Sequence, residues 1–186
     1  MPQPNWRDDL RDFRKLGRPR LFFGISAGCM DSMVNKYTAN KRLRSDDAYT
    51  PDGRPDMRPE YPSIVYTQIL KKLYPDVPVV LGGIEASMRR LSHYDYWQDR
   101  LKKSILCESG ADMLIYGMGE KPICELVRRL TALCDNQDGV ISSSDIHSPA
   151  LSSIPQTAYL TRKYESDEND ITLYSHEECL ADKKKQ

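Results

Sequence analysis

The sequence lacks the features that would place it in a membrane or outside the cell. None of its apolar runs approaches the ~20 residues that a membrane-spanning helix needs. Its first residues, MPQPNWRDDLRDF, are charged and contain proline, unlike a secretory signal. The 27 basic and 27 acidic residues cancel, which gives no support for a broad surface that binds nucleic acid or anionic lipid. We expect a cytoplasmic protein without a membrane or nucleic-acid partner.

Paired cysteine motifs are missing as well. The five cysteines, at positions 29, 107, 124, 134 and 179, have no Cys-x-x-Cys or Cys-x-x-x-Cys spacing, and the sequence has no His-x-x-x-His. An odd number of widely spaced cysteines indicates reduced thiols rather than a disulfide framework. The sequence therefore offers no recognisable metal or iron–sulfur site of its own.

Nucleotide-binding fingerprints are absent, but one hydrolase-like motif is present. The chain has no Walker sequence, and GGIEAS (82–87) is not G-x-G-x-x-G. GISAG (24–28) matches the G-x-S-x-G of a nucleophile elbow, in which Ser26 would attack the substrate. The motif is short, and such hydrolases need a larger sheet, so a hydrolase is a minor hypothesis. The candidate bases would be His93, His147 and His176.

Short apolar segments alternate with helical periods along most of the chain. Strands are expected at 20–26, 78–82, 112–117 and 157–162. Helices are expected at 6–16, from 62 to about 73, near 93–107, from about 122 to 133, and from 175 onward. In HYDYW (93–97) the aromatic residues recur at helical intervals, which favours packing in the core. Strand–helix alternation predicts an α/β fold with a parallel sheet covered on both faces.

The strand ends of such a sheet carry glycine. Right-handed crossovers bring the carboxyl ends of parallel strands to one edge, where open α/β sheets bind ligands. Glycine permits sharp turns and lets a ligand approach the backbone. Ligand binding and simple tight turns both explain this pattern, and Arg89 could either meet an anion there or begin a solvated helix. The glycines at these ends are Gly24, Gly28, Gly82, Gly83, Gly117 and Gly119.

Residues 38–61 have no helical or strand period and contain three prolines. A structureless stretch of this length in a compact domain is either functional or a solvated excursion. We expect it to be mobile or to cover the carboxyl edge of the sheet, with Arg44, Asp46 and Asp47 near Glu85 or Arg89.

Three long stretches together carry a family resemblance. They are GRPRLFFGISAGCMDSMVNKYTANKRLRSDDAYTPDGRPDMRPEYPSIVYTQ (17–68), VPVVLGGIEASMRRLSHYDYW (77–97) and ADMLIYGMGEKPICELV (111–127). They closely resemble the N-terminal region of the YgiQ-type radical SAM proteins, an uncharacterised bacterial family, from about residue 4 to residue 186. The resemblance implies an incomplete three-layer, flavodoxin-like domain similar to cobalamin-binding domains.

Related radical SAM enzymes have one strand that ends in Gly-Gly-x-His and another that ends in Gly-x-Gly-Glu. The resemblance adds Glu85 and Glu120 to the candidates at the carboxyl edge. Glu85 stands where the pattern has histidine, which counts against cobalamin binding. The full set of candidates is Ser26, Gly28, Gly82, Gly83, Glu85, Arg89, Gly117, Gly119 and Glu120.

The resemblance also implies what lies outside this chain. The family has further strands before the matching region and a radical SAM barrel after it. The barrel's Cys-x-x-x-Cys-x-x-Cys holds a [4Fe–4S] cluster that cleaves S-adenosylmethionine. None of the five cysteines here matches it, so we expect a fragment without catalytic or metal-ligating residues. Residues 1–135 would be the front domain, and residues 136–186 a linker, strand and helix that lead to the barrel.

The expected role is to shape or cover the active site of a radical SAM enzyme of unknown substrate. The alternative is a stand-alone module that binds a small ligand or a partner without catalysis. If the chain is a fragment, the strand at 20–26 should have an open outer edge. The Ser175–Glu178 capping box should begin a poorly packed helix that runs to the end of the chain.

Overall fold

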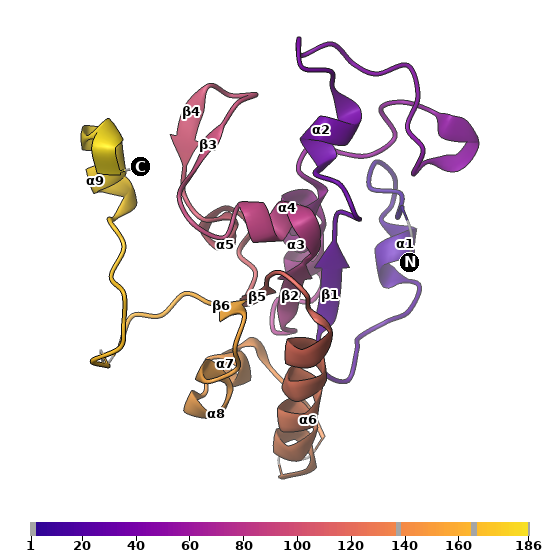
Figure 1. The fold of residues 1–186 in the computed structure, drawn as a ribbon. Helices are drawn as coiled ribbons and strands as arrows, with labels where there is room; N and C mark the ends of the chain where they lie inside the picture. Colours follow the sequence, from indigo (N-terminus) through magenta and orange to yellow (C-terminus); the bar gives the residue numbers. More distant parts are fainter. Residues whose placement is uncertain (1–2, 137–138, 165–166, 186) are drawn as a thin grey trace.

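A four-stranded sheet lies at the centre of the computed structural model, which describes residues 3–136, 139–164 and 167–185. Its strand order is β1-β2-β5-β6 (Figure 1). Strands β1, β2 and β5 are parallel, and β6 is antiparallel to β5. The structure therefore confirms a mostly parallel, incomplete flavodoxin-like layout. The strands are β1 (Phe23–Ser26), β2 (Val79–Gly82), β5 (Met113–Ile115) and β6 (Thr157–Ala158).

Alternating side chains of the strands feed two separate apolar cores. Val79 and Leu81 face one core, whereas Val80 faces the other. The first core includes side chains of α1 (Arg11–Arg14), α3 (Pro62–Leu73), α4 (Gly83–Met88) and α5 (Ile105–Ser109). The second includes side chains of α6 (Glu120–Asn136), α7 (Ser143–Ile146) and α8 (Pro149–Ser152). Cover on both faces explains why the strands are continuously apolar.

The predicted helices at 62 and 122 are confirmed, and their sequences explain them. Proline at the first helical position suits α3, because its missing N–H needs no partner there. In α6, Leu126, Leu130 and Cys134 recur every four residues and are fully buried. That helix begins two residues before the predicted start.

The helix predicted near 93–107 is wrong. A hairpin of β3 (His93–Asp95) and β4 (Arg100–Lys102) stands there, followed by the short helix α5. Asp99 turns the chain with a φ of +51°. Tyr94 is 58% exposed and Asp95 is buried, so the aromatic residues are not in a helical core. The aromatic and apolar side chains stand three and four residues apart, as on a helix, and this spacing concealed the two-residue alternation of a strand.

Two other elements are shorter than predicted. Of residues 6–16 only α1 is helical, because Leu10 has a left-handed backbone, and Leu16 is exposed. Only Thr157 and Ala158 of the strand predicted at 157–162 join the sheet. The Gly-containing turn after β1 leads into α2 (Ser32–Lys36), and a 3₁₀ turn, η1 (Pro51–Gly53), lies in the loop that follows.

Both ends of the described chain behave largely as predicted. In the described part of the chain β1 pairs only with β2, so it is an edge strand. Ser175 and Glu178 form the predicted capping box at the start of α9 (His176–Ala181), which stands apart from the sheet (Figure 1). The helix does not run to the end, because Asp182 is extended and only a 3₁₀ turn, η2 (Lys183–Lys185), follows.

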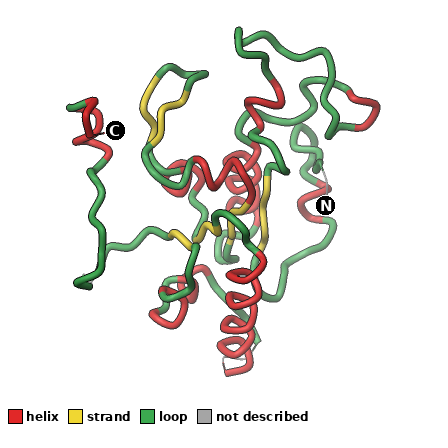
Figure 2. The backbone as a smooth tube through the Cα atoms, in the orientation of Figure 1, coloured by secondary structure: helices red, strands yellow, loops and turns green. Residues whose placement is uncertain are grey.

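The segment before α9 runs as extended chain, coloured as loop in Figure 2. Its apolar side chains Ile171 and Leu173 are exposed. A Lys103–Glu177 ion pair of 2.8 Å and a Ser92–His176 hydrogen bond of 3.1 Å connect α9 to the hairpin region. None of the helices that the structure describes is long and apolar enough to cross a membrane.

Candidate functional site

The turns that follow β1 and β2 touch each other. A Cβ atom on Gly83 would lie 2.4 Å from Ser26 Oγ and 3.3 Å from the Gly28 carbonyl oxygen. Gly83 also has a φ of +81°, which side chains disfavour. Gly82 is less constrained, since a Cβ there would meet only the Ile115 oxygen at 3.9 Å. Close packing of two turns therefore requires glycine at position 83.

The turn after β5 joins the same surface. The Gly117 N–H donates to Ser87 Oγ of α4 at 3.2 Å. A Cβ on Gly117 would lie 3.0 Å from the Gln156 amide nitrogen, and one on Gly119 would lie 3.4 Å from Ile115. Glu120 is exposed at the start of α6. All the candidates predicted from the sequence thus lie at or just beyond the carboxyl edge of the sheet.

Glu85 is fully buried beneath this edge. One carboxylate oxygen accepts the Ser32 N–H of α2, and the other accepts the Ser63 N–H of α3, both at 3.2 Å. A carboxylate is favoured at helix N-termini, where backbone N–H groups lack partners within the helix. Glu85 therefore joins two helix starts, and this residue at the histidine position is not free to ligate a cobalt ion.

Arg89 meets an anion from its own chain. Its guanidinium forms a buried ion pair with Asp31, the N-cap residue of α2, and stacks 5.2 Å from the Tyr61 ring centroid. Burial alone would lower the pKa of Arg89, but the Asp31 carboxylate and the nearby Glu85 raise it. Tyr61 in turn donates to Asp95 at 2.7 Å. Burial and this bond raise the pKa of Tyr61, so its hydroxyl stays protonated.

The carboxyl edge also exposes apolar side chains above this charged layer. Each of the three parallel strands is followed by at least one exposed apolar side chain. Exposed methionines and isoleucines that gather on one surface are typical of interaction sites. We call this group the edge patch; its members are Met30 (41% exposed), Ile84 (45%), Met88 (63%) and Met118 (74%).

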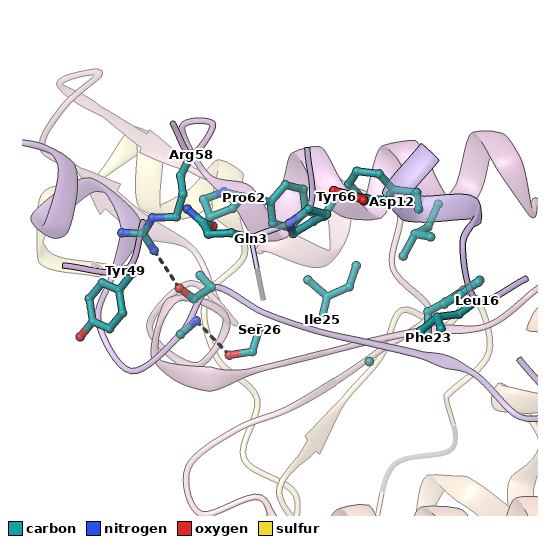
Figure 3. Close-up of a pocket in the computed structure, with 16 residues that line it drawn as sticks. Gln3, Asp12, Leu16, Phe23, Ile25, Ser26, Tyr49, Arg58, Pro62 and Tyr66 are labelled. Carbon is teal, nitrogen blue, oxygen red and sulfur yellow. Dashed lines mark hydrogen bonds between the residues drawn. The ribbon is translucent and has the colours of Figure 1, made fainter. Parts of the chain in front are cut away.

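Loop 38–61 lies over the end of β1, as predicted. Arg58 donates to the Ala27 carbonyl oxygen at 3.2 Å (Figure 3). It also pairs with Asp47 at 3.0 Å. The finer prediction is wrong, because Asp47 bonds to Arg58 and Asn35, and Arg44 bonds to the Val34 carbonyl. Asp31 is the carboxylate that reaches Arg89. Asp46 is exposed beside Ser45.

A cleft of about 390 Å³ runs along the outer edge of β1 (Figure 3). Strand β1 and its following turn form one wall, and the chain around α1 and the helix α3 form the others. The Tyr66 side chain of α3 lines it. The sequence predicted the helix that carries Tyr66 but gave no signal for this cleft, because its walls lie far apart in the chain.

The hydrolase hypothesis is not supported. The hydrogen bond of Ser26 Oγ in the described chain comes from the Gly28 N–H, at 3.1 Å (Figure 3). The three histidines have other neighbours: His93 the Leu91 carbonyl, His147 the Tyr159 ring, and His176 the Ser92 hydroxyl. No described histidine therefore stands beside Ser26 as a base.

The cysteines do not fit an iron–sulfur cluster. Cys29, Cys107 and Cys124 are exposed on different elements, whereas Cys134 and Cys179 are buried. Among the described residues no three His, Cys, Asp or Glu side chains are placed to share a metal ion. The described residues therefore bring together no ligand set for a [4Fe–4S] cluster.

The family model described as "Radical SAM N-terminal" matches residues 1–186, the whole chain. The chain belongs to the radical SAM N-terminal family. A UPF0313 protein of Bacteroides thetaiotaomicron is 75% identical over all of this chain, which covers 30% of that relative. One of Porphyromonas gingivalis is 66% identical, with 28% of its length covered. The UPF0313 protein YgiQ of Escherichia coli is 56% identical over 69% of this chain, and the match covers 17% of the length of that relative.

The chain thus spans less than a third of the curated relatives it matches, and it corresponds to the N-terminal part of these radical SAM family members. No solved structure matches it. Family membership suggests a [4Fe–4S] cluster and S-adenosylmethionine in the longer protein, outside the residues described above.

Proposed function

We propose that this chain is the non-catalytic N-terminal part of a radical SAM enzyme, and that its carboxyl edge shapes or covers the active site. The edge patch carries this proposal, because it exposes apolar side chains at the end of every parallel strand. The partner would be the radical SAM domain of the same polypeptide, which would hold the cluster and S-adenosylmethionine.

The buried charges beneath the edge patch support the same role. Glu85 and the Asp31–Arg89 pair fix α2, α3 and α4 to one another. Loop 38–61, held by Arg58 on the Ala27 carbonyl, extends this platform on the side of β1. The buried charges hold the backbone of this surface in place, which suits docking because little backbone must be ordered on contact.

We further propose that residues 1–135 form the front domain and that residues 136–186 lead to the radical SAM domain. Residues 141–154 would then belong to the connecting segment and also pack on the front domain, because Ile141, Ile146, Leu151 and Ile154 lie in the second core. The exposed segment before α9 would be the connection itself.

Hydrogen exchange tests the docking in the full-length protein. We expect the amides of 83–89 and 117–120 to exchange more slowly there than in the 186-residue chain. Met88→Glu should abolish this difference and reduce the formation of 5′-deoxyadenosine from S-adenosylmethionine without lowering the iron content. Val140→Glu is the matched control, since Val140 is exposed beyond the end of α6, at the opposite edge. Equal exchange in both proteins would reject the proposal.

A further inference from the structure

The four residues before the capping box of α9 expose large apolar side chains. Ile171 is 85% exposed, Leu173 61% and Tyr174 57%. Solvated linkers usually consist of glycine, serine, proline or charged residues, which lose little by facing water. The segment 171–174, with the sequence ITLY, contains none of these residues. Apolar side chains that gather in this way are typical of a surface that another part of a protein covers.

The backbone of the segment is also without partners in the part of the chain that the structure describes. It runs as extended chain outside the helices and strands (Figure 2). The N–H groups of residues 171–174 donate to none of the described residues, and neither described sheet includes the segment. An extended chain with a row of unpaired N–H and C=O groups is a template for another strand.

The residue types of the segment favour a strand. Ile171 and Thr172 are β-branched and Tyr174 is aromatic, and both classes are enriched in strands. Side chains alternate along a strand, so Ile171 and Leu173 would share one face. The capping box at Ser175 stops α9 from extending backward over the segment. Backbone and side chains therefore both suit a single added strand with one apolar face.

Neighbouring contacts already hold the two ends of the segment. Before it, the Asp170 N–H donates to the Asp167 carbonyl at 3.1 Å and closes a turn. After it, the ion pair of Lys103 and Glu177 connects α9 to the hairpin region. A segment whose ends are fixed loses less conformational freedom when it pairs, which favours pairing.

The longer protein can supply the partner strand. This chain covers 30% of the Bacteroides thetaiotaomicron relative and corresponds to its N-terminal part, so more than two thirds of that protein lies outside the match. A partner on the same polypeptide has an effective concentration of the order of millimolar when the linker is short. Pairing within one polypeptide is therefore favoured over pairing between two copies.

We propose that residues 171–174 form a β-strand with the part of the polypeptide that follows residue 186, in which we place the radical SAM domain. Main-chain hydrogen bonds hold the added strand, and Ile171 and Leu173 face the apolar interior of the partner. The inference rests on the proposed function for the identity of the partner, but it uses a surface separate from the edge patch.

Hydrogen exchange in the full-length protein, resolved to single amides by fragmentation in the mass spectrometer, tests the pairing. A strand paired on one side bonds through alternate N–H groups. We expect at least two alternate amides of 171–174 to exchange about a hundredfold more slowly than in an unstructured peptide. The amides of 83–89 and 117–120 report the edge-patch contact separately, so failure of one contact is distinguishable from failure of the other. Unstructured rates at all four amides would overturn the inference.

Leu173→Lys should abolish this protection, because a charge cannot be buried against an apolar partner without a large cost. Leu180→Lys is the matched control, since Leu180 is 59% exposed but lies on α9, outside the segment. It should leave the protection unchanged. Exchange in β2 should stay the same in both variants, which separates lost pairing from lost folding. Equal loss in Leu180→Lys would overturn the inference, as would protection that rises with protein concentration, the sign of pairing between two copies.

Discussion

Two regions of the molecule bury polar groups: the layer beneath the edge patch and the wall of the cleft beside β1. They differ in which of those groups have a hydrogen-bond partner. Beneath the edge patch, Glu85 accepts two backbone N–H groups, and Arg89 pairs with Asp31. In the wall of the cleft, the Tyr66 hydroxyl has no partner in the described chain. Ser32 Oγ, Ser63 Oγ and Arg89 Nε beneath the edge patch also lack a partner among the described residues. The fold thus pairs the charges of the buried side chains and leaves some neutral hydroxyls unpaired.

The comparison separates side chains that hold parts of the fold together from one that no described residue pairs. Glu85 and Arg89 were candidates for ligand contact, yet their side chains already bind other parts of the chain. We therefore expect substitutions of the charged residues beneath the edge patch to change stability strongly, and the substitution of Tyr66 to change it little. The following experiments test that division, from the largest expected effect to the smallest.

The largest effect should come from Arg89→Met. Removal of one partner of a buried ion pair leaves the other charge uncompensated and costs about 3–5 kcal/mol. Here that charge is the buried Asp31. Urea unfolding measures the loss. Arg90→Met is the control, because Arg90 donates to the Ser87 carbonyl rather than to a carboxylate; equal losses in the two variants would contradict the role of the pair.

Glu85→Gln should destabilise the chain by about 1–2 kcal/mol, because a neutral amide has one acceptor oxygen where the carboxylate has two. The amide nitrogen would also face a helix N–H. Amides of Ser32 and Ser63 should exchange faster in the variant. Glu120→Gln, at an exposed position, should change the free energy of unfolding little. If Glu85→Gln is equally mild, the carboxylate does not join the helix starts.

Acid should weaken the chain through two other buried carboxylates, those of Asp47 and Asp95. Burial alone would raise the pKa of Asp47 and Asp95, but it is outweighed. Hydrogen bonds from Asn35 and the Tyr49 N–H and the charge of Arg58 lower the pKa of Asp47. Hydrogen bonds from Tyr61 and the Gln98 N–H lower that of Asp95.

Since both folded pKa values lie below the unfolded value of about 3.9, their stabilisation is complete above that pH and is lost below it. Urea unfolding between neutral pH and pH 3 should show this loss. Asp47→Asn should be less stable at neutral pH and lose less on acidification. A variant with the acid sensitivity of the wild type would show that Asp47 does not contribute.

The smallest effect compares two buried tyrosines directly. Tyr61→Phe leaves Asp95 without its hydroxyl partner and should cost about 1 kcal/mol. Tyr66→Phe removes an unpaired hydroxyl and should leave the free energy of unfolding unchanged or slightly raised. Urea unfolding measures both. A clear loss in Tyr66→Phe would mean that its hydroxyl has a partner within the protein.

The sequence predicted the sheet well because strand and turn signals are local. Val79, Val80 and Leu81 are apolar on both sides, and the glycines that follow mark the edge. The hairpin at 93–102 was mistaken for helix, since Tyr94 and Leu101, which pair across the hairpin, also stand two helical turns apart in the sequence. Local spacing could not separate the two.

Partners at the carboxyl edge could not be read from the sequence. Arg89 and Asp31 are 58 residues apart, and Glu85 and Ser32 are 53 apart. The aspartate that begins α2 is a recognisable N-cap, but nothing local says that it also binds an arginine. The Tyr66 cleft was missed for the same reason, because its walls meet only in the folded chain.

Glu85 also sets an order of assembly during synthesis. The ribosome completes α2 and α3 well before residue 85 emerges. When both helices are first made, their first N–H groups therefore lack the Glu85 carboxylate as a partner. Both hydrogen bonds can form only after Glu85 has been made, and the bond to Ser32 of α2 spans 53 residues. Contacts of such long range slow folding. The starts of α2 and α3 are therefore joined only after β2 and the turn that follows it have left the tunnel.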